Sequence, residues 1–162
     1  MDNPCQPCKD FIRSTEQLFG TTLGKYGFTL AECYGEESGR GSECQVMYCA
    51  SIGQLLFVWQ DGAAFCCLGT REATFPPFEL LRGTGEYGWY YSIALAEAEA
   101  ATRLVSDRMW RDFAKGDASS YEWEAALLAE RAERLFAYLA ATAPQIARQQ
   151  LAEALDKQPT IW

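Results

Sequence analysis

The chain has 162 residues, of which 49% are hydrophobic, carries a formal net charge of −8 and contains no histidine. A chain of this size can bury roughly two thirds of its unfolded surface in one core, so we expect a single domain, 1–162. The lack of histidine excludes imidazole metal ligands and the Ser-His-Asp and Cys-His catalytic pairs.

The charge is unevenly distributed along the chain. Residues 1–100 carry 6 Lys and Arg against 13 Asp and Glu, whereas residues 101–162 carry 8 against 9. An acidic surface repels phosphate backbones and suits a basic protein partner, so we expect a protein partner and no direct nucleic-acid binding. The alternative is that moderate acidity only keeps the protein soluble. No pattern indicates an oligomeric state.

The hydropathy and cysteine patterns bear on location. The longest uncharged apolar run, 51–60, is far shorter than the roughly 20 residues of a membrane-spanning helix, and residues 1–10 lack the apolar core of a signal peptide. We therefore predict a cytoplasmic protein that does not enter membranes. Seven cysteines at irregular spacing are a poor disulfide framework, so we expect most of them to be reduced packing residues.

The first predicted element is a helix over 10–23. Phe11, Leu18 and Phe19 recur close to helical spacing, and Gly24 supplies a C-terminal stop. From Tyr26 to Tyr34 apolar residues alternate instead, which predicts the first strand of a sheet.

Residues 43–69, with the sequence ECQVMYCASIGQLLFVWQDGAAFCCLG, predict three more strands joined by tight turns. The strands are expected near 44–51, 54–60 and 63–68. Cys66 and Cys67 are adjacent in the last of them, so their side chains should point to opposite faces of the sheet. A short aromatic edge strand is expected within 87–93.

The chain is expected to be helical from Leu95 onward. Ala98, Ala101, Val105, Met109 and Phe113 form one predicted stripe that ends at Gly116.

A capping box then opens the next predicted helix, at Ser119 and Glu122. Its apolar stripe consists of Leu128, Ala132, Leu135 and Leu139. Pro144 suits the first turn of a last helix. The expected fold is therefore α+β: a four- to five-stranded antiparallel meander sheet over 26–93, packed against C-terminal helices over 95–156, with the N-terminal helix beside them.

Cys5-Gln-Pro-Cys8 is a CxxC motif just ahead of the first predicted helix. Helix N-terminal N–H groups lower the pKa of a thiol, so the motif is compatible with a thiol redox or metal site. Thioredoxin-like proteins place their CxxC after a strand, and none is predicted here. The alternative is that these cysteines have no chemical role. Cys44 and Cys49 fall on opposite faces of a strand and do not complete a zinc site, so no cofactor is expected.

Aromatic residues among acids suggest a protein interface. Such a composition is typical of surfaces that recognise basic groups, although the same aromatics can instead fill the space between sheet and helices. The predicted partner-binding residues are Glu36, Glu37, Asp61, Glu72, Glu79, Glu86 and Trp89.

The order of these parts resembles a set of small bacterial α+β proteins of unknown or immunity-type function. The phrases that carry the resemblance are LLFVWQDGAAFCCLG, EYGWYY and FAKGDASSYEWE, and it covers about residues 10–135. It implies a stand-alone domain that acts by binding, such as an immunity protein that blocks a toxin. The five cysteines of the sheet region depart from that pattern.

No complete catalytic constellation can be assembled from these residues. We therefore predict a non-enzymatic protein–protein interaction module that binds a basic partner. The alternative is a thiol redox or metal-binding protein that uses Cys5 and Cys8.

Overall fold

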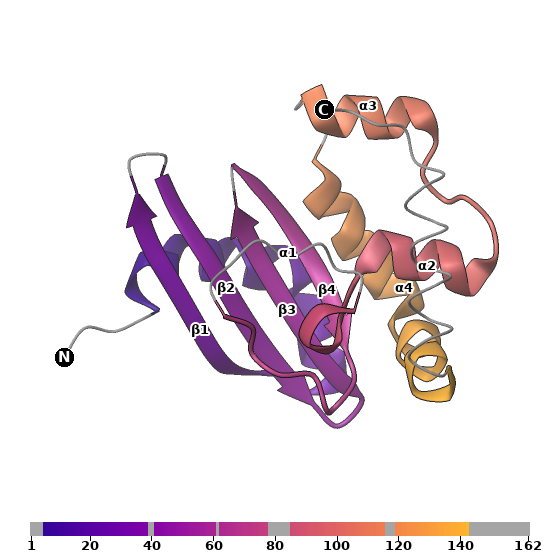
Figure 1. Ribbon diagram of the computed structural model, residues 1–162, viewed down its shortest axis with the longest axis horizontal. Coiled ribbons are helices and arrows are strands. Elements are labelled where there is room, and N and C mark those ends of the chain that lie inside the picture. Colours follow the sequence, from indigo (N-terminus) through magenta and orange to yellow (C-terminus); the bar gives the residue numbers. More distant parts are fainter. Residues whose placement is uncertain (1–4, 39–40, 61, 78–84, 116–118, 143–162) are drawn as a thin grey trace.

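The computed structural model describes residues 5–38, 41–60, 62–77, 85–115 and 119–142 (Figure 1). It confirms the α+β class, with a five-stranded antiparallel sheet, an N-terminal helix and C-terminal helices. The elements in chain order are η1 (Gln6–Cys8), α1 (Lys9–Tyr26), β1 (Thr29–Ser38), β2 (Gly41–Ala50), β3 (Gly53–Gln60), β4 (Ala63–Gly69), η2 (Glu86–Gly88), β5 (Trp89–Tyr91), α2 (Ser92–Ala100), α3 (Asp107–Lys115) and α4 (Ser120–Ala141). The strands lie in the sheet in chain order, so the sheet is a simple meander.

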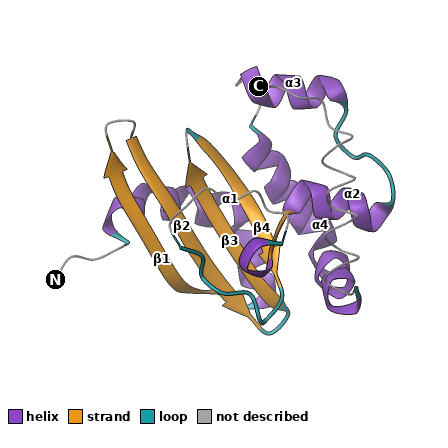
Figure 2. Cartoon of the chain, in the orientation of Figure 1, coloured by secondary structure: helices purple, strands orange, loops and turns teal. Residues whose placement is uncertain are grey.

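Both faces of the sheet are covered. Figure 2 shows α1 behind the sheet, while the loop that follows β4 crosses the opposite face. In β3, the residues from Gly53 to Val58 are all buried, and the four side chains from Leu55 to Val58 alternate between two apolar clusters. Leu55 and Phe57 face the helices, whereas Leu56 and Val58 face the loop.

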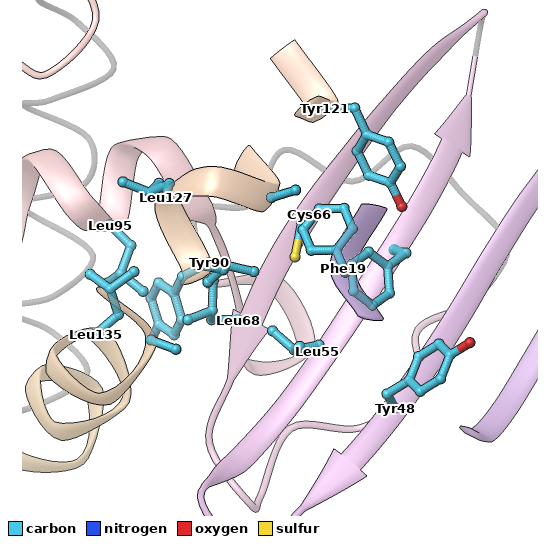
Figure 3. Close-up of a cluster of buried hydrophobic side chains, with 14 of the residues drawn as sticks. Phe19, Tyr48, Leu55, Cys66, Leu68, Tyr90, Leu95, Tyr121, Leu127 and Leu135 are labelled. Carbon is cyan, nitrogen blue, oxygen red and sulfur yellow. The ribbon is translucent and has the colours of Figure 1, made fainter. Parts of the chain in front are cut away.

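The cluster on the helix side is the larger core. Phe19 of α1 packs on Phe57 at 4.7 Å and on Tyr121 of α4 at 4.9 Å between ring centroids. Thr15 and Tyr121 share a buried hydrogen bond of 2.6 Å. Figure 3 shows Phe19, Cys66 and Tyr121 together at one end of this core, with Leu95, Leu127 and Leu135 at the other.

The cluster on the opposite face is built around Trp89 of β5, which is fully buried. Its Nε1–H donates to the carbonyl of Thr74 at 2.7 Å. Gln54 holds the same loop, because its amide nitrogen donates to the carbonyls of Thr70, Arg71 and Ala73. Cys67 lies in this cluster and Cys66 in the larger core, so the prediction that they face opposite ways is confirmed.

The first helix is longer than predicted. It continues through Gly24 to Tyr26, and Gly27 ends it with a left-handed φ of 71°. Gly27 carries the C-terminal cap because a glycine adopts this conformation without steric cost. The strand consequently starts at Thr29 instead of Tyr26.

The helix expected from Leu95 to Gly116 is interrupted. Ala101 adopts a left-handed φ of 55° and ends α2, while α3 starts only at Asp107. Glu97 stabilises the connection, since its Oε2 accepts a hydrogen bond from the Leu104 N–H at 2.8 Å. The prediction of one continuous helix from Leu95 to Gly116 was therefore wrong. The apolar spacing continues through this segment, but the hydrogen bond between Glu97 and Leu104 stabilises a non-helical connection.

The capping box at α4 is supported, because Ser119 Oγ accepts the Glu122 N–H at 3.4 Å. All members of the predicted stripe of this helix are buried, namely Leu128, Ala132, Leu135 and Leu139. The helix expected after Pro144 lies outside the described residues.

A buried carboxyl group joins α4 to the sheet. Glu124 is fully buried, and its Oε1 accepts hydrogen bonds from the Cys66 backbone N–H at 2.9 Å and from the Ser92 hydroxyl at 2.7 Å. Among the described residues its Oε2 has no partner. Burial raises the pKa of Glu124 to about 8, although the two hydrogen bonds act in the opposite direction.

The raised pKa predicts that stability falls as pH rises. The folded protein retains this proton up to about pH 8, whereas the unfolded chain loses it near its ordinary value of 4.5. The contribution is therefore fully present below pH 4.5 and declines towards pH 8 by up to about 1.4 kcal/mol per pH unit. The variant E124Q keeps an oxygen acceptor and cannot ionise. Urea unfolding over this pH range should show a flatter dependence for E124Q than for wild type.

The matched control is E130Q, at an exposed position on the same helix. It should keep the wild-type slope. If E124Q and E130Q give the same pH dependence, Glu124 is not the group that titrates.

Candidate functional site at the edge of the sheet

The predicted acidic and aromatic surface does not form one patch. Trp89 is fully buried, so its assignment to an exposed interface was wrong. Glu36 lies near the β1–β2 hairpin, whereas Glu72 follows β4 at the opposite end of the strands. Glu86 lies in η2, on the loop that covers the sheet. Asp61, Glu79 and the side chain of Glu37 lie outside the described residues.

The first strand, β1, is exposed along one edge of the sheet. β1 has 10 residues and is the outermost strand, and within the described ranges β2 alone pairs with it. Leu30 and Tyr34 are 44% and 36% exposed, and both belong to this strand. Glu32 and Glu36 are exposed there as well, and Glu36 accepts a hydrogen bond from the Tyr34 hydroxyl at 2.9 Å. A long edge strand presents a row of backbone N–H and C=O groups with which a further strand can pair.

An irregularity near the start of β1 sets which side chains face inward. Leu30 pairs with Tyr48 and Cys33 with Val46, so β1 has one more residue in this stretch than β2. In regular pairing Glu32 would oppose Val46, and Cys33 would fall on the other face. The bulge therefore places Cys33 on the helix side, where it is 5% exposed.

Four cysteines meet behind this strand. Cys5 is bonded to Cys33 and Cys8 to Cys44, with Cα–Cα distances of 5.4 and 5.6 Å. The expectation of reduced cysteines was therefore wrong for these four. The CxxC residues bond to β1 and β2 instead of to each other, which is not the dithiol pairing of a thioredoxin-like site. We call this group of Cys5, Cys8, Cys33 and Cys44 the four-cysteine junction.

A turn at Cys5–Cys8 and a glycine in β1 allow the four-cysteine junction to form. The Cys8 N–H donates to the Cys5 carbonyl at 3.0 Å, so both cysteines project from one turn. Gly35 lies directly beneath that turn, where a Cβ would overlap Cys8 Sγ and lie 3.1 Å from Pro7 Cβ and 3.3 Å from Cys44 Sγ. The turn can approach the strands because Gly35 has no side chain.

The other three cysteines are unbonded and serve packing. Cys66 and Cys67 are fully buried, and burial raises the pKa of both thiols well above the ordinary value. Burial also raises the pKa of Cys49, whose thiol lies 3.2 Å from Gln54 Oε1. Reactive thiols have a lowered pKa, so these three do not have the character of nucleophiles.

Comparison with known proteins gives no relative. The chain matches no protein-family model, no curated protein and no solved structure. Within the described ranges, none of the helices has the length and apolar character needed to cross a membrane. The resemblance to immunity-type proteins stays a prediction.

Sequence reasoning identified Cys5 and Cys8 but missed their partners. Cys44 was compared with Cys49, and the structure confirms that these two face opposite sides of β2. The relevant partner in the sheet was Cys33, which reaches the face of Cys44 only through the bulge. One signal in the sequence pointed to this pairing: Cys33 precedes and Cys44 follows the predicted acidic turn, so the two cysteines lie on neighbouring strands.

The close contact between Gly35 and the N-terminal turn yields a prediction. In G35A the new methyl group displaces the N-terminal turn, so we expect incomplete disulfide formation and a loss of stability of about 1–3 kcal/mol. Thiol titration of the unreduced, denatured protein should rise above the three free cysteines of wild type.

The matched control is G20A in α1, where an added Cβ meets nothing within 4 Å. This variant should keep three titratable thiols. Equal thiol counts and unfolding midpoints for G35A and wild type would show that the contact with Gly35 is dispensable.

Proposed function

We propose that this protein is a non-enzymatic interaction module that binds a basic, extended segment of a partner protein along the outer edge of β1. The observation that carries the proposal is a ten-residue edge strand with exposed Leu30 and Tyr34. In strand addition, main-chain hydrogen bonds supply affinity and alternate side chains supply specificity.

The charge of the strand supports a basic partner. Glu32 and Glu36 are exposed on β1, and the chain as a whole carries a net charge of −8. Opposite charges speed diffusional encounter and disfavour acidic competitors. The proposal keeps the class of function predicted from sequence and moves the binding site from the dispersed acids to one strand.

The four-cysteine junction supports the same role by fixing the shape of the edge. Cys8 Sγ lies 3.4 Å from the Tyr34 carbonyl, and Cys5 Sγ lies 3.9 Å from that of Cys33. These contacts brace the middle of β1 from its inner side. A strand that is already ordered loses less conformational entropy when a partner pairs with it.

A synthetic peptide tests the proposal directly. The probe has ten residues, the length of β1, and alternates lysine with valine. We expect calorimetry to show binding that weakens with salt, and NMR to show amide shifts within Thr29–Ser38. The double variant E32K/E36K should weaken binding roughly tenfold, since the charge attraction becomes repulsion.

The matched control is E130K/E133K, which changes net charge equally at exposed positions on α4. It should bind as wild type does. Absence of binding by wild type, equal loss in both double variants, or shifts confined to α4 would each refute β1 as the binding edge.

A further inference from the structure

The four-cysteine junction brings four sulfur atoms together from two separate parts of the fold. Cys5 and Cys8 project from the turn η1, while Cys33 and Cys44 belong to neighbouring strands. Gly35 pairs with Cys44, and Cys33 precedes Gly35 by two residues on the same face. Cys33 and Cys44 are therefore diagonal neighbours, which lie about 7–8 Å apart in a sheet.

These positions suit tetrahedral coordination. Zinc binds thiolates at about 2.3 Å, so the sulfurs of a tetrathiolate site lie roughly 4 Å from one another. Each CxxC sulfur already reaches a strand sulfur, with Cα–Cα distances of 5.4 and 5.6 Å. Cys8 Sγ and Cys44 Sγ both lie directly against Gly35, where an added Cβ would meet each of them. The CxxC spacing is also that of one half of a structural zinc site.

We propose that the four-cysteine junction, when reduced, is a zinc site with four thiolate ligands. A dithiol reductant supplies two electrons and two protons to each disulfide, which breaks the S–S bond, yields two thiols and oxidises the dithiol to its own disulfide. Zinc then replaces the four thiol protons, which pass to solvent. In the disulfide form, no group of three or more Cys, Asp or Glu side chains among the described residues is arranged to hold a metal. A sulfur bonded in a disulfide is not a thiolate ligand, so the disulfide form and the zinc form exclude each other.

Zinc offsets the cost of burying these cysteines as thiolates once the disulfides are broken. Cys8, Cys33 and Cys44 are at most 5% exposed, and burial of an unbonded thiolate is costly. A zinc ion neutralises half of the charge of four thiolates, and Lys9 adjoins Cys8 in the chain. The same docking of η1 on β1 and β2 would thus persist in a reducing compartment, where disulfides are rare.

Zinc titration of the reduced protein tests the proposal. Wild type held in a non-thiol reductant should bind one zinc per chain, and cobalt in its place should give the visible absorption of tetrahedral thiolate coordination. The unreduced protein should bind none. Alkylation followed by peptide mapping should show that zinc protects Cys5, Cys8, Cys33 and Cys44 and leaves the reactivity of Cys49 unchanged.

Two substitutions locate the ligands. C33S and C44S should each abolish one-to-one binding, whereas the control C49S, on the opposite face of β2 from Cys44, should retain it. If a serine variant fails to fold by circular dichroism, the alkylation pattern of wild type decides the question. Reduced, folded wild type that binds no zinc, retention of zinc by both serine variants, or protection that excludes Cys33 and Cys44 would overturn the proposal.

Discussion

The hydrogen bond from the Cys66 N–H to Glu124 lies where the sheet gives way to the helices. β5 pairs with β4 only from Cys67 to Gly69, so the backbone of β4 extends beyond the end of its neighbour. A buried N–H without an acceptor costs about 1–3 kcal/mol, and the carboxyl group from α4 supplies that acceptor. The same oxygen binds Ser92, the first residue of α2, so one side chain fixes three elements. Burial of a carboxylate would cancel this gain, which is why the group holds its proton to about pH 8.

The opposite edge of the sheet is stabilised differently. α4 anchors the β4 side of the sheet through Glu124, whereas η1 lies against β1 and β2. Two covalent bonds hold η1 in place, and Gly35 provides the space for them. The β4 side of the sheet is therefore closed by a buried hydrogen-bond network, whereas within the described residues the β1 edge is held by η1 on its inner face alone. The outer side of β1 remains open to a further strand among the described parts of the chain.

Short-range patterns predicted the elements better than their boundaries. Alternation, tight turns and the capping box at Ser119 correctly gave the meander and the start of α4. The break at Ala101 depends on a hydrogen bond from Leu104 to Glu97, which helical spacing does not reveal. The prediction that Trp89 is exposed was wrong because the burial of its side chain depends on the loop after β4. Gln54 holds that loop in place, and this contact joins residues that are distant in the sequence.

The pairing of the junction cysteines could not be predicted from the sequence for a related reason. A single extra residue in β1 moves the side chain of every later residue in the strand to the other face of the sheet. A prediction that assumes regular alternation therefore cannot place Cys33 on the same face as Cys44. The bulge thereby turns an isolated CxxC into part of a four-cysteine group. It also sets the phase of the exposed edge, because Tyr34 and Glu36 change face together with Cys33. The positions of the inner sulfurs and of the side chains on the exposed edge are consequently two results of one local distortion, and any change that removes the bulge must alter both.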